Sequence, residues 1–98
     1  MIKLIIKRII WLEEFIEKIY LKHNVKQKEV YEILFGNTLY RFVEKGHRKN
    51  ENIFVGLGKT PNERYLIVFF VYKKDGSVLV ISARDMTKKE KKHYDNEK

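Results

Sequence analysis

Hydrophobic and polar residues alternate at the start of the chain and again through its second half, with the period of two that a half-buried strand requires. Over Ile2–Ile10 most apolar side chains fall on one face while lysines point the other way, which predicts a strand. Four further strands, rich in β-branched and aromatic residues, are predicted at Thr38–Lys45, Asn52–Lys59, Tyr65–Lys73 and Ser77–Arg84. The third of these four is apolar on both faces, so we expect it to be the most central strand of the sheet.

The pattern between the first two strands has a helical period instead. Side chains of an apolar stripe recur three or four residues apart, at Leu12, Phe15, Ile16, Ile19, Tyr20 and His23. After a break at Asn24 a second helix is predicted over Gln27–Phe35, ending at Gly36 in the left-handed conformation. Near the end of the chain, Thr87 and Glu90 have the spacing of a capping box, which predicts a short final helix that runs toward Tyr94.

These elements predict a single α+β domain over residues 1–98, in the order β-α-α-β-β-β-β-α, with residues 95–98 as a frayed tail. Two N-terminal helices pack on a mostly antiparallel sheet of four to five strands, and a short C-terminal helix is appended. Asp75 and Gly76 mark a tight hairpin before the last strand. Gly56 and Gly58 lie inside a strand pattern and indicate a bulge or a close approach of another part of the chain.

The charge balance adds a polyanionic partner to this picture. The chain has 21 Lys and Arg residues against 13 Asp and Glu, a formal net charge of +8, which favours nucleic acid, an anionic membrane or an acidic protein. The absence of cysteine excludes disulfides, a cysteine nucleophile and a thiolate metal site. The apolar start is interrupted by Lys3, Lys7 and Arg8 and is shorter than the ~20 apolar residues of a membrane span, so we expect a cytoplasmic protein without a membrane partner.

The candidate chemistry is that of cations. The three histidines, His23, His47 and His93, have no carboxylate at ligand spacing and no glycine-rich phosphate loop is present, so neither a metal nor a cofactor is expected. The last strand ends in Arg84, which a regular strand places on the same face as Val78, Val80 and Ser82. Candidate RNA-contacting side chains come from the basic segment Arg41–Lys49 and from the final helix, and are Arg41, Lys45, Arg48, Lys49, Lys88 and Lys91.

Each candidate also has a structural interpretation. His23 fits a helix-end histidine, and Glu90 fits a backbone cap. The ring of Tyr94 can simply cover the sheet, and Arg84 fits a structural salt bridge as well as it fits a phosphate contact. A lysine-rich helix is typical of a solvated surface. Composition alone therefore supports a basic protein that faces nucleic acid and goes no further.

Several motifs resemble those of one family, the BrnT-type toxins. The run Ile81–Thr87 (ISARDMT), followed by Glu90 and Tyr94, resembles the family's ISAR…E…Y ending. Trp11, with Lys22-His23 and Val25 further on, resembles its W…KHGV segment at the same spacing. A pair of predicted strands that contains Val55–Gly58 and Arg64–Phe70 is similar to the family's strand pair between those motifs.

The resemblance implies a RelE-like fold and a toxin of a type II toxin–antitoxin system. Such a toxin is a metal-independent endoribonuclease without a cofactor, and it cuts RNA to inhibit translation. The implied partner is a cognate ribbon-helix-helix antitoxin of the BrnA kind, which covers the toxin, and operator DNA is bound only through that complex. A net charge of +8 suits an RNA substrate when the toxin is free and an acidic antitoxin segment when it is silent.

By the same resemblance the catalytic residues are Lys22, His23, Arg64, Arg84, Glu90 and Tyr94. Arg84 and Arg64 are expected to bind the scissile phosphate and stabilise its developing charge. Either His23 or Glu90 is the base, and Tyr94 or Lys22 positions the RNA or protonates the leaving oxygen.

The chain departs from the family pattern at four residues. Leu12 follows Trp11 where Asp is usual, and Asn24 replaces a glycine but can adopt a positive φ. Leu79 and Val80 stand where many members have an arginine, which removes one phosphate contact.

Two other functions remain open on the sequence. One is a nucleic-acid-binding module without catalysis, which would bind RNA and leave it uncut. The other is a toxin of related fold that poisons a protein target such as a topoisomerase, which would alter DNA supercoiling and leave RNA whole.

Overall fold

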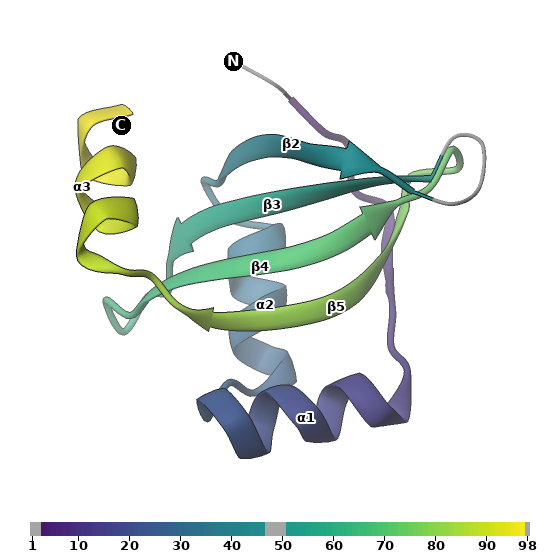
Figure 1. The fold of residues 1–98 in the computed structure, drawn as a ribbon, viewed down its shortest axis with the longest axis horizontal. Coiled ribbons are helices and arrows are strands. Elements are labelled where there is room, and N and C mark those ends of the chain that lie inside the picture. The colour runs from purple at the N-terminus through teal and green to yellow at the C-terminus, as the bar shows by residue number, and fades with distance from the viewer. Residues whose placement is uncertain (1–2, 47–50, 98) are drawn as a thin grey trace.

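The structure, a computed structural model, describes residues 3–46 and 51–97 and is an α+β fold of three helices and five strands. The elements follow the predicted order β-α-α-β-β-β-β-α (Figure 1). Their bounds are β1 Arg8–Ile10, α1 Glu13–His23, α2 Gln27–Leu34, β2 Leu39–Lys45, β3 Asn52–Lys59, β4 Tyr65–Tyr72, β5 Ser77–Asp85 and α3 Lys88–Glu97. The predicted fold class is confirmed, and the last four strands agree with their predicted ranges to within one residue.

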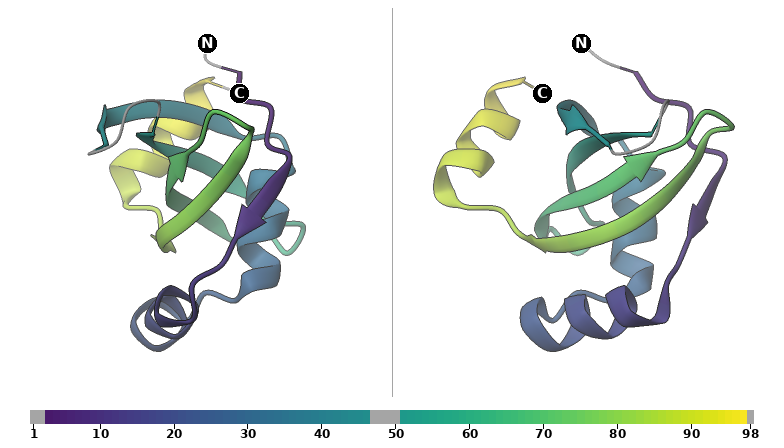
Figure 2. Two further views of the ribbon diagram at one scale, coloured as in Figure 1. Left: turned by 90° about the vertical axis from the view of Figure 1, so that its right-hand side faces the viewer. Right: turned by 45° about the vertical axis from the view of Figure 1, so that its right-hand side comes forward.

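The five strands form one sheet in the order β1-β5-β4-β3-β2. All neighbouring pairs are antiparallel except β1 and β5, which are parallel. The doubly apolar strand β4 is central in this order, as its sequence predicts. Both of its faces are covered, by α1 and α2 on one side and in part by α3 on the other (Figure 2).

Two core clusters lie on the two faces of the sheet. The larger one packs Ile19 of α1 and Ile33 of α2 against the buried side chains Leu66, Val68 and Phe70 of β4. The second lies under α3 and contains Leu39, Val55, Leu57, Ile67 and Tyr94. Neighbouring residues of β4 therefore alternate between the two clusters, which is the geometry of a strand buried on both faces.

The N-terminal strand is shorter than predicted. Only Arg8–Ile10 pairs with a neighbour, because β5 itself begins at Ser77, the partner of Arg8. Before this pair the chain stays close to the hairpin without forming a ladder: the Lys7 amide donates to the Gly76 carbonyl at 2.8 Å. The alternation of apolar and polar residues thus begins several residues before the first residue that has a partner strand.

The left-handed helix end predicted at Gly36 is wrong. The α2 helix ends at Leu34, and Gly36 is not among the residues with a positive φ. A side chain at Gly36 would instead meet the Glu32 carbonyl oxygen at 2.5 Å, so a close approach explains this glycine. The left-handed position is the C-cap of α1, where Asn24 has φ 52°.

The predicted hairpin and close approach are both confirmed. Gly76 has φ 88° in the turn between β4 and β5, and its amide donates to the Lys73 carbonyl. A Cβ atom at Gly58 would lie 3.1 Å from Ile33 Cδ1, so this glycine lets β3 approach α2. The final helix runs through residues 95–97, where a frayed tail was expected, to Glu97.

A bulge in β5 decides where the end of that strand points. Phe69 pairs with Ser82 and Phe70 pairs with Val80, so Ile81 is an extra residue in the ladder. Val78, Val80 and Ala83 therefore share the face of α1 and α2. Arg84 lies on the opposite face, against the ring of Phe69, with its guanidinium carbon 5.5 Å from the ring centroid. The predicted common face of Arg84 with Val78 and Val80 is wrong for this reason.

Candidate functional site

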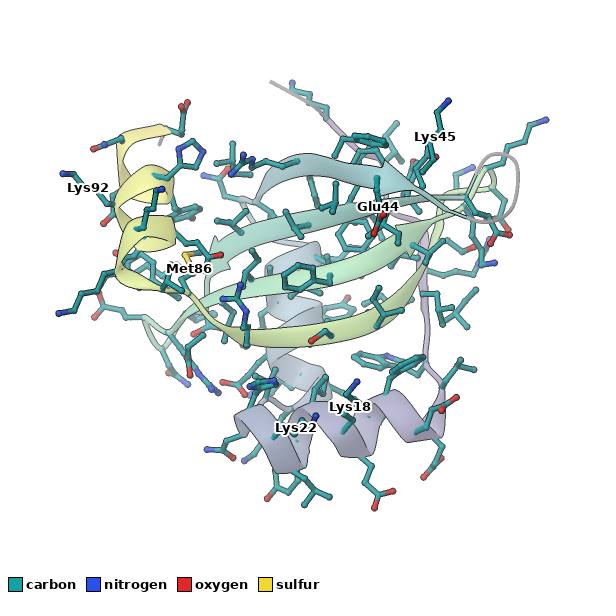
Figure 3. The ribbon with its side chains drawn as sticks, viewed as in Figure 1. Lys18, Lys22, Glu44, Lys45, Met86 and Lys92 are labelled. Atoms are coloured by element: carbon teal, nitrogen blue, oxygen red, sulfur yellow. The ribbon has the colours of Figure 1, made fainter. Side chains whose placement is uncertain are left out.

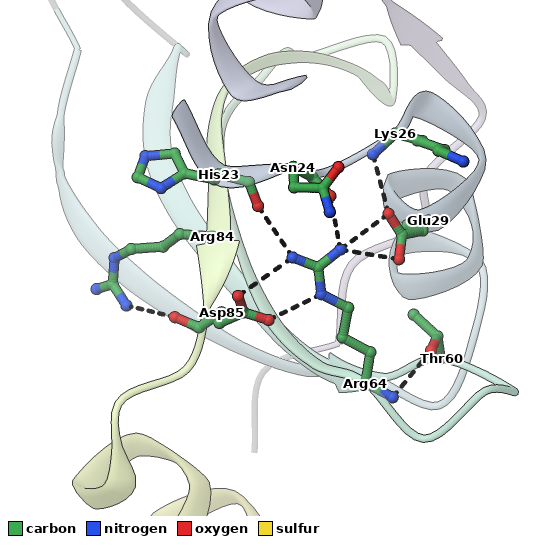
Figure 4. A network of polar contacts seen from close by, with 8 residues as sticks. All are labelled: His23, Asn24, Lys26, Glu29, Thr60, Arg64, Arg84 and Asp85. Carbon is green, nitrogen blue, oxygen red and sulfur yellow. Dashed lines mark hydrogen bonds and ion pairs between the residues drawn. The ribbon is translucent and has the colours of Figure 1, made fainter. Parts of the chain in front are cut away.

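Arg64 forms the centre of a polar network between α1, α2 and β5 (Figure 4). Its Nε and Nη2 donate to the two carboxylate oxygens of Asp85 at 2.8 and 3.1 Å, and its Nη1 lies 3.0–3.1 Å from the Glu29 carboxylate. The same guanidinium donates to the backbone carbonyls of Asn24 and His23, at 2.8 and 2.9 Å. Since a guanidinium has five N–H donors, every donor of Arg64 is engaged.

Partial burial strengthens this network. The side chains of Arg64 and Glu29 are 24% and 22% exposed, whereas that of Asp85 is 62% exposed. The hydrogen bonds from Arg64 lower the pKa of the Asp85 carboxyl, and the positive charge of Arg64 lowers it further. The pKa of Arg64 is raised, chiefly by the hydrogen bond to Asp85. Arg64 is thus a fixed cation whose charge is already balanced by two carboxylates.

Arg84 lies beside this network but keeps part of its guanidinium open. Its Nη1 and Nη2 donate end-on to the Glu90 carboxylate at 2.8 and 3.0 Å, and Nη1 also donates to the Asp85 carbonyl at 3.1 Å. Among the described residues nothing accepts from its Nε or from the second Nη2 hydrogen. These two donors form one edge of the guanidinium, and such an edge matches a phosphate in bidentate geometry.

Glu90 joins Arg84 to the first turn of α3. The predicted capping box is present: the Thr87 amide donates to Glu90 Oε1 at 2.8 Å and the Glu90 amide donates to Thr87 Oγ1 at 3.1 Å. Hydrogen bonding from Arg84, helped by the cap, lowers the pKa of Glu90 from 4.5 to about 2. A general base works best when its pKa lies near the operating pH, so this carboxylate is a poor base.

The low pKa of Glu90 predicts an acid-sensitive contribution to stability. Because the pKa is lower in the folded than in the unfolded chain, the contribution is fully present above about pH 4.5 and is lost as the pH falls toward 2. In thermal unfolding followed over this range, the difference in unfolding free energy between wild type and Glu90→Gln is expected to shrink steadily with acidification. The other carboxylates titrate in both proteins, so their contributions cancel in this difference. A difference in unfolding free energy that stays constant over the range would contradict the low pKa of Glu90.

Tyr94 is buried beneath α3. It is 6% exposed, its hydroxyl donates to the Asn37 carbonyl at 3.3 Å, and its ring meets that of Tyr65 edge-on at 5.9 Å. Burial raises the pKa of the hydroxyl. The ring therefore anchors α3 on the sheet, and the hydroxyl points to the chain that leads into β2.

His23 and Lys22 occupy the last turn of α1. Figure 4 shows the His23 ring and the Arg84 side chain extending from the network in the same direction. The His23 side chain is partly buried and that of Lys22 is exposed. Figure 3 shows Lys18 and Lys22 together on α1, below β5 in that view. The structure thus brings His23, Arg64, Arg84 and Glu90 into one region and places Lys22 next to it.

The structure describes four of the six predicted RNA-contacting residues. Arg41 and Lys45 are exposed on the edge strand β2, while Lys88 and Lys91 lie on α3. Figure 3 places Lys45 at the end of β2 remote from α3. The ammonium of Lys91 stacks over the Tyr65 ring, 4.3 Å from its centroid, and Arg48 and Lys49 lie outside the described residues. Lys88 and Lys91 are joined to the Arg84 region through their helix, in which Glu90 binds Arg84.

Two features are absent from the part of the chain that the structure describes. No helix in ranges 3–46 and 51–97 is long and apolar enough to cross a membrane. Within the same ranges no three His, Cys, Asp or Glu side chains are grouped so that they could hold a metal ion.

Sequence reasoning missed the two carboxylates that bind Arg64. Asp85 directly follows the arginine of the ISAR motif, and Glu29 lies in the first turn of α2. A signal was available: an arginine that opens a strongly apolar strand needs anions, and an acidic residue beside a second arginine is a natural partner. Neither sequence distance nor periodicity, however, indicates which carboxylate a distant arginine selects.

Comparison with known proteins identifies the family. A family model described as "Ribonuclease toxin, BrnT, of type II toxin-antitoxin system" matches residues 11–90. The fold is similar to the crystal structure of the Brucella abortus ribonuclease toxin BrnT, with a TM-score of 0.57 and 17% sequence identity over 83% of this chain and 97% of that chain. No curated protein is significantly similar in sequence. Because the family model covers most of the chain, including the helices and strands that build the network, the protein belongs to the BrnT family of ribonuclease toxins of type II toxin–antitoxin systems.

Proposed function

We propose that this toxin cuts RNA without a metal ion, in the cytoplasm, and thereby inhibits translation. The observation that carries the proposal is the open edge of the Arg84 guanidinium, on a side chain that extends from the Arg64 network in the same direction as the His23 ring, in a chain of the ribonuclease toxin family. A fixed cation at this position supplies the charge that a divalent metal supplies in other nucleases. We also propose that the antitoxin partner is of the ribbon-helix-helix, BrnA-like kind, and that operator DNA is bound only through the toxin–antitoxin complex.

In the proposed reaction His23 is the base. Its imidazole removes the proton of a ribose 2′-hydroxyl, and the oxygen attacks the adjacent phosphorus. Arg84 donates through Nε and Nη2 to the phosphate oxygens as negative charge develops on them. The 5′-oxygen leaves with a proton, for which the exposed ammonium of Lys22 is the proposed donor, since the Tyr94 hydroxyl is buried and directed to a backbone carbonyl. The products are a 2′,3′-cyclic phosphate and a free 5′-hydroxyl.

The structure favours a supporting role for two residues proposed as catalytic on the sequence. Glu90 holds Arg84 end-on and has a pKa of about 2, so it orients the arginine rather than accepting a proton. Arg64 has no donor left for a phosphate, so we propose that it positions its neighbours. The lysines Lys88 and Lys91 extend the positive surface along α3 and are proposed to contact RNA beyond the scissile phosphate.

The proposal is tested by incubating purified wild-type, His23→Ala and Glu90→Gln proteins with RNA in the presence of a chelator. Wild type is expected to cut the RNA, and His23→Ala is expected to lose at least about a hundredfold in kcat because the base is gone. Glu90→Gln keeps an oxygen for Arg84 and for the helix cap, so its kcat is expected to stay within about tenfold of wild type. Mass spectrometry of the fragments should find the 2′,3′-cyclic phosphate.

Three outcomes would contradict parts of this scheme. Cleavage that stops with chelator rules out metal independence. A larger loss in Glu90→Gln than in His23→Ala makes Glu90 the base. RNA that is bound but left whole by wild type, with a folded protein, leaves a binding module instead of a nuclease.

A further inference from the structure

We infer that Glu29 and Asp85 are positioning residues for RNA cleavage, which act through Arg64 to fix the end of α1 and with it the His23 imidazole. This inference rests on the proposed function of His23. Neither carboxylate faces the open edge of Arg84, and their effect is transmitted through a single guanidinium.

The end of α1 is closed by two backbone bonds, from the Asn24 amide to the Tyr20 carbonyl at 2.9 Å and from the Val25 amide to the Ile19 carbonyl at 3.2 Å, which leave the His23 and Asn24 carbonyls to partners outside the helix. The last turn of a helix leaves its carbonyls without partners inside the helix, and α1 ends at an asparagine in the left-handed conformation. Arg64 binds these carbonyls from outside the helix: Nη2 donates to the His23 carbonyl at 2.9 Å and Nη1 donates to the Asn24 carbonyl at 2.8 Å. The residue that carries the proposed base is thus bound directly, through its own carbonyl, to Arg64.

The two carboxylates fix the orientation of Arg64. Asp85 takes the edge formed by Nε and Nη2, and Glu29 takes Nη1, so the plane of the guanidinium is held from two sides. Glu29 is itself fixed, because its Oε1 accepts the Lys26 amide at 3.0 Å in the first turn of α2. Asp85 is fixed by the end of β5, one residue after Arg84. The network therefore sets the position of His23 relative to Arg84.

A shift of about 1 Å in a catalytic group lowers the rate strongly while leaving substrate affinity nearly unchanged. We expect Asp85→Asn and Glu29→Gln each to lower kcat about tenfold, with KM within about twofold of wild type. Both substitutions keep one oxygen acceptor and the side-chain shape, but they remove the negative charge that faces the Arg64 guanidinium and replace the second acceptor oxygen with an NH2 donor. Asp75→Asn is the matched control: Asp75 also pairs with an arginine, Arg8, its side chain is 64% exposed against 62% for Asp85, and it precedes the other end of β5.

The experiment has two readouts, and both use the full chain at a temperature where thermal unfolding shows every variant to be folded. The first is kcat and KM for RNA cleavage. The second is the nuclear magnetic resonance spectrum of the histidine rings, in which His23 is identified among the three histidines by His23→Ala. Asp85→Asn and Glu29→Gln are expected to shift or broaden the His23 ring signals, and Asp75→Asn is expected to leave them unchanged.

The outcomes are distinguishable. Lower kcat together with altered His23 signals supports the inference. Wild-type kcat in both variants, lower kcat with unaltered His23 signals, or an equal effect of Asp75→Asn overturns it. If wild type itself does not cleave RNA, the proposed function fails, and the ring signals still show whether the two carboxylates position His23.

Discussion

Replacement of Arg84 by alanine is expected to lower kcat for RNA cleavage by about a hundredfold to a thousandfold. The variant loses the two donors that face the phosphate, and removal of one preorganised donor to a developing oxyanion already costs about that factor. The structure gives Arg84 this role because the edge formed by Nε and Nη2 is open, while all five donors of Arg64 are engaged. Single-turnover cleavage of a defined RNA, with protein in excess, measures the chemical step directly.

A loss of activity in Arg84→Ala must be separated from a loss of α3, since the same substitution removes the partner of Glu90. Circular dichroism and thermal unfolding check that α3 and the sheet remain folded. Arg84→Lys is the companion variant: it keeps the positive charge but cannot hold both Glu90 and a phosphate in fork geometry, so we expect it to recover only a small part of the rate. If Arg84→Ala is folded and cuts RNA at the wild-type rate, Arg84 is not at the site.

The largest effect on stability is expected for Arg64→Ala. The substitution leaves a Glu29 carboxylate that is only 22% exposed without its cation, and it frees two backbone carbonyls at the end of α1. Breaking a buried ion pair from one side costs about 3–5 kcal/mol, and partial exposure reduces this to about 2–3 kcal/mol here. The Asp85 side chain is 62% exposed and adds little. Urea unfolding of both proteins measures the difference.

The comparison for this second substitution is Arg8→Ala. Arg8 also forms an ion pair at the sheet, with Asp75 at 3.1 Å, but its side chain is 57% exposed and that of its partner 64%. Solvent screens such a pair, so the unfolding curve of Arg8→Ala is expected to stay close to that of wild type. Equal destabilisation by the two substitutions would mean that the Arg64 network adds nothing beyond an ordinary surface contact.

Much of the fold could be predicted because local patterns and global packing agree. The doubly apolar run of β4 required a strand covered on both sides, and the spacing of Thr87 and Glu90 indicated where α3 begins. Asn24 could replace a glycine because its side chain tolerates a positive φ. The first strand was overestimated because alternation along one chain says nothing about the length of its partner, and β1 pairs over only Arg8–Ile10.

The site was harder to predict than the fold. His23, Arg84 and Glu90 were found through motif residues, and the structure gathers them in one region. Their roles depend on contacts between residues far apart in sequence: Arg64 reaches Asp85 across 21 positions and Glu29 across 35. No periodic pattern encodes such a choice of partner. The bulge at Ile81 was equally hidden, because an isoleucine fits either a regular strand or an extra residue in the ladder.

That single extra residue also fixes how the end of one strand serves two sides of the molecule. Successive side chains leave a strand in opposite directions, so Arg84 and Asp85 lie on different faces of the sheet. Arg84 faces the surface that is open to a substrate, and Asp85 faces the contact between the helices and the sheet. Loss or gain of one residue upstream would exchange them, sending the anion outward and the cation inward. We therefore expect a one-residue insertion or deletion between the bulge and Arg84 to disturb both side chains, whereas substitutions that preserve the length of β5 keep each on its own face.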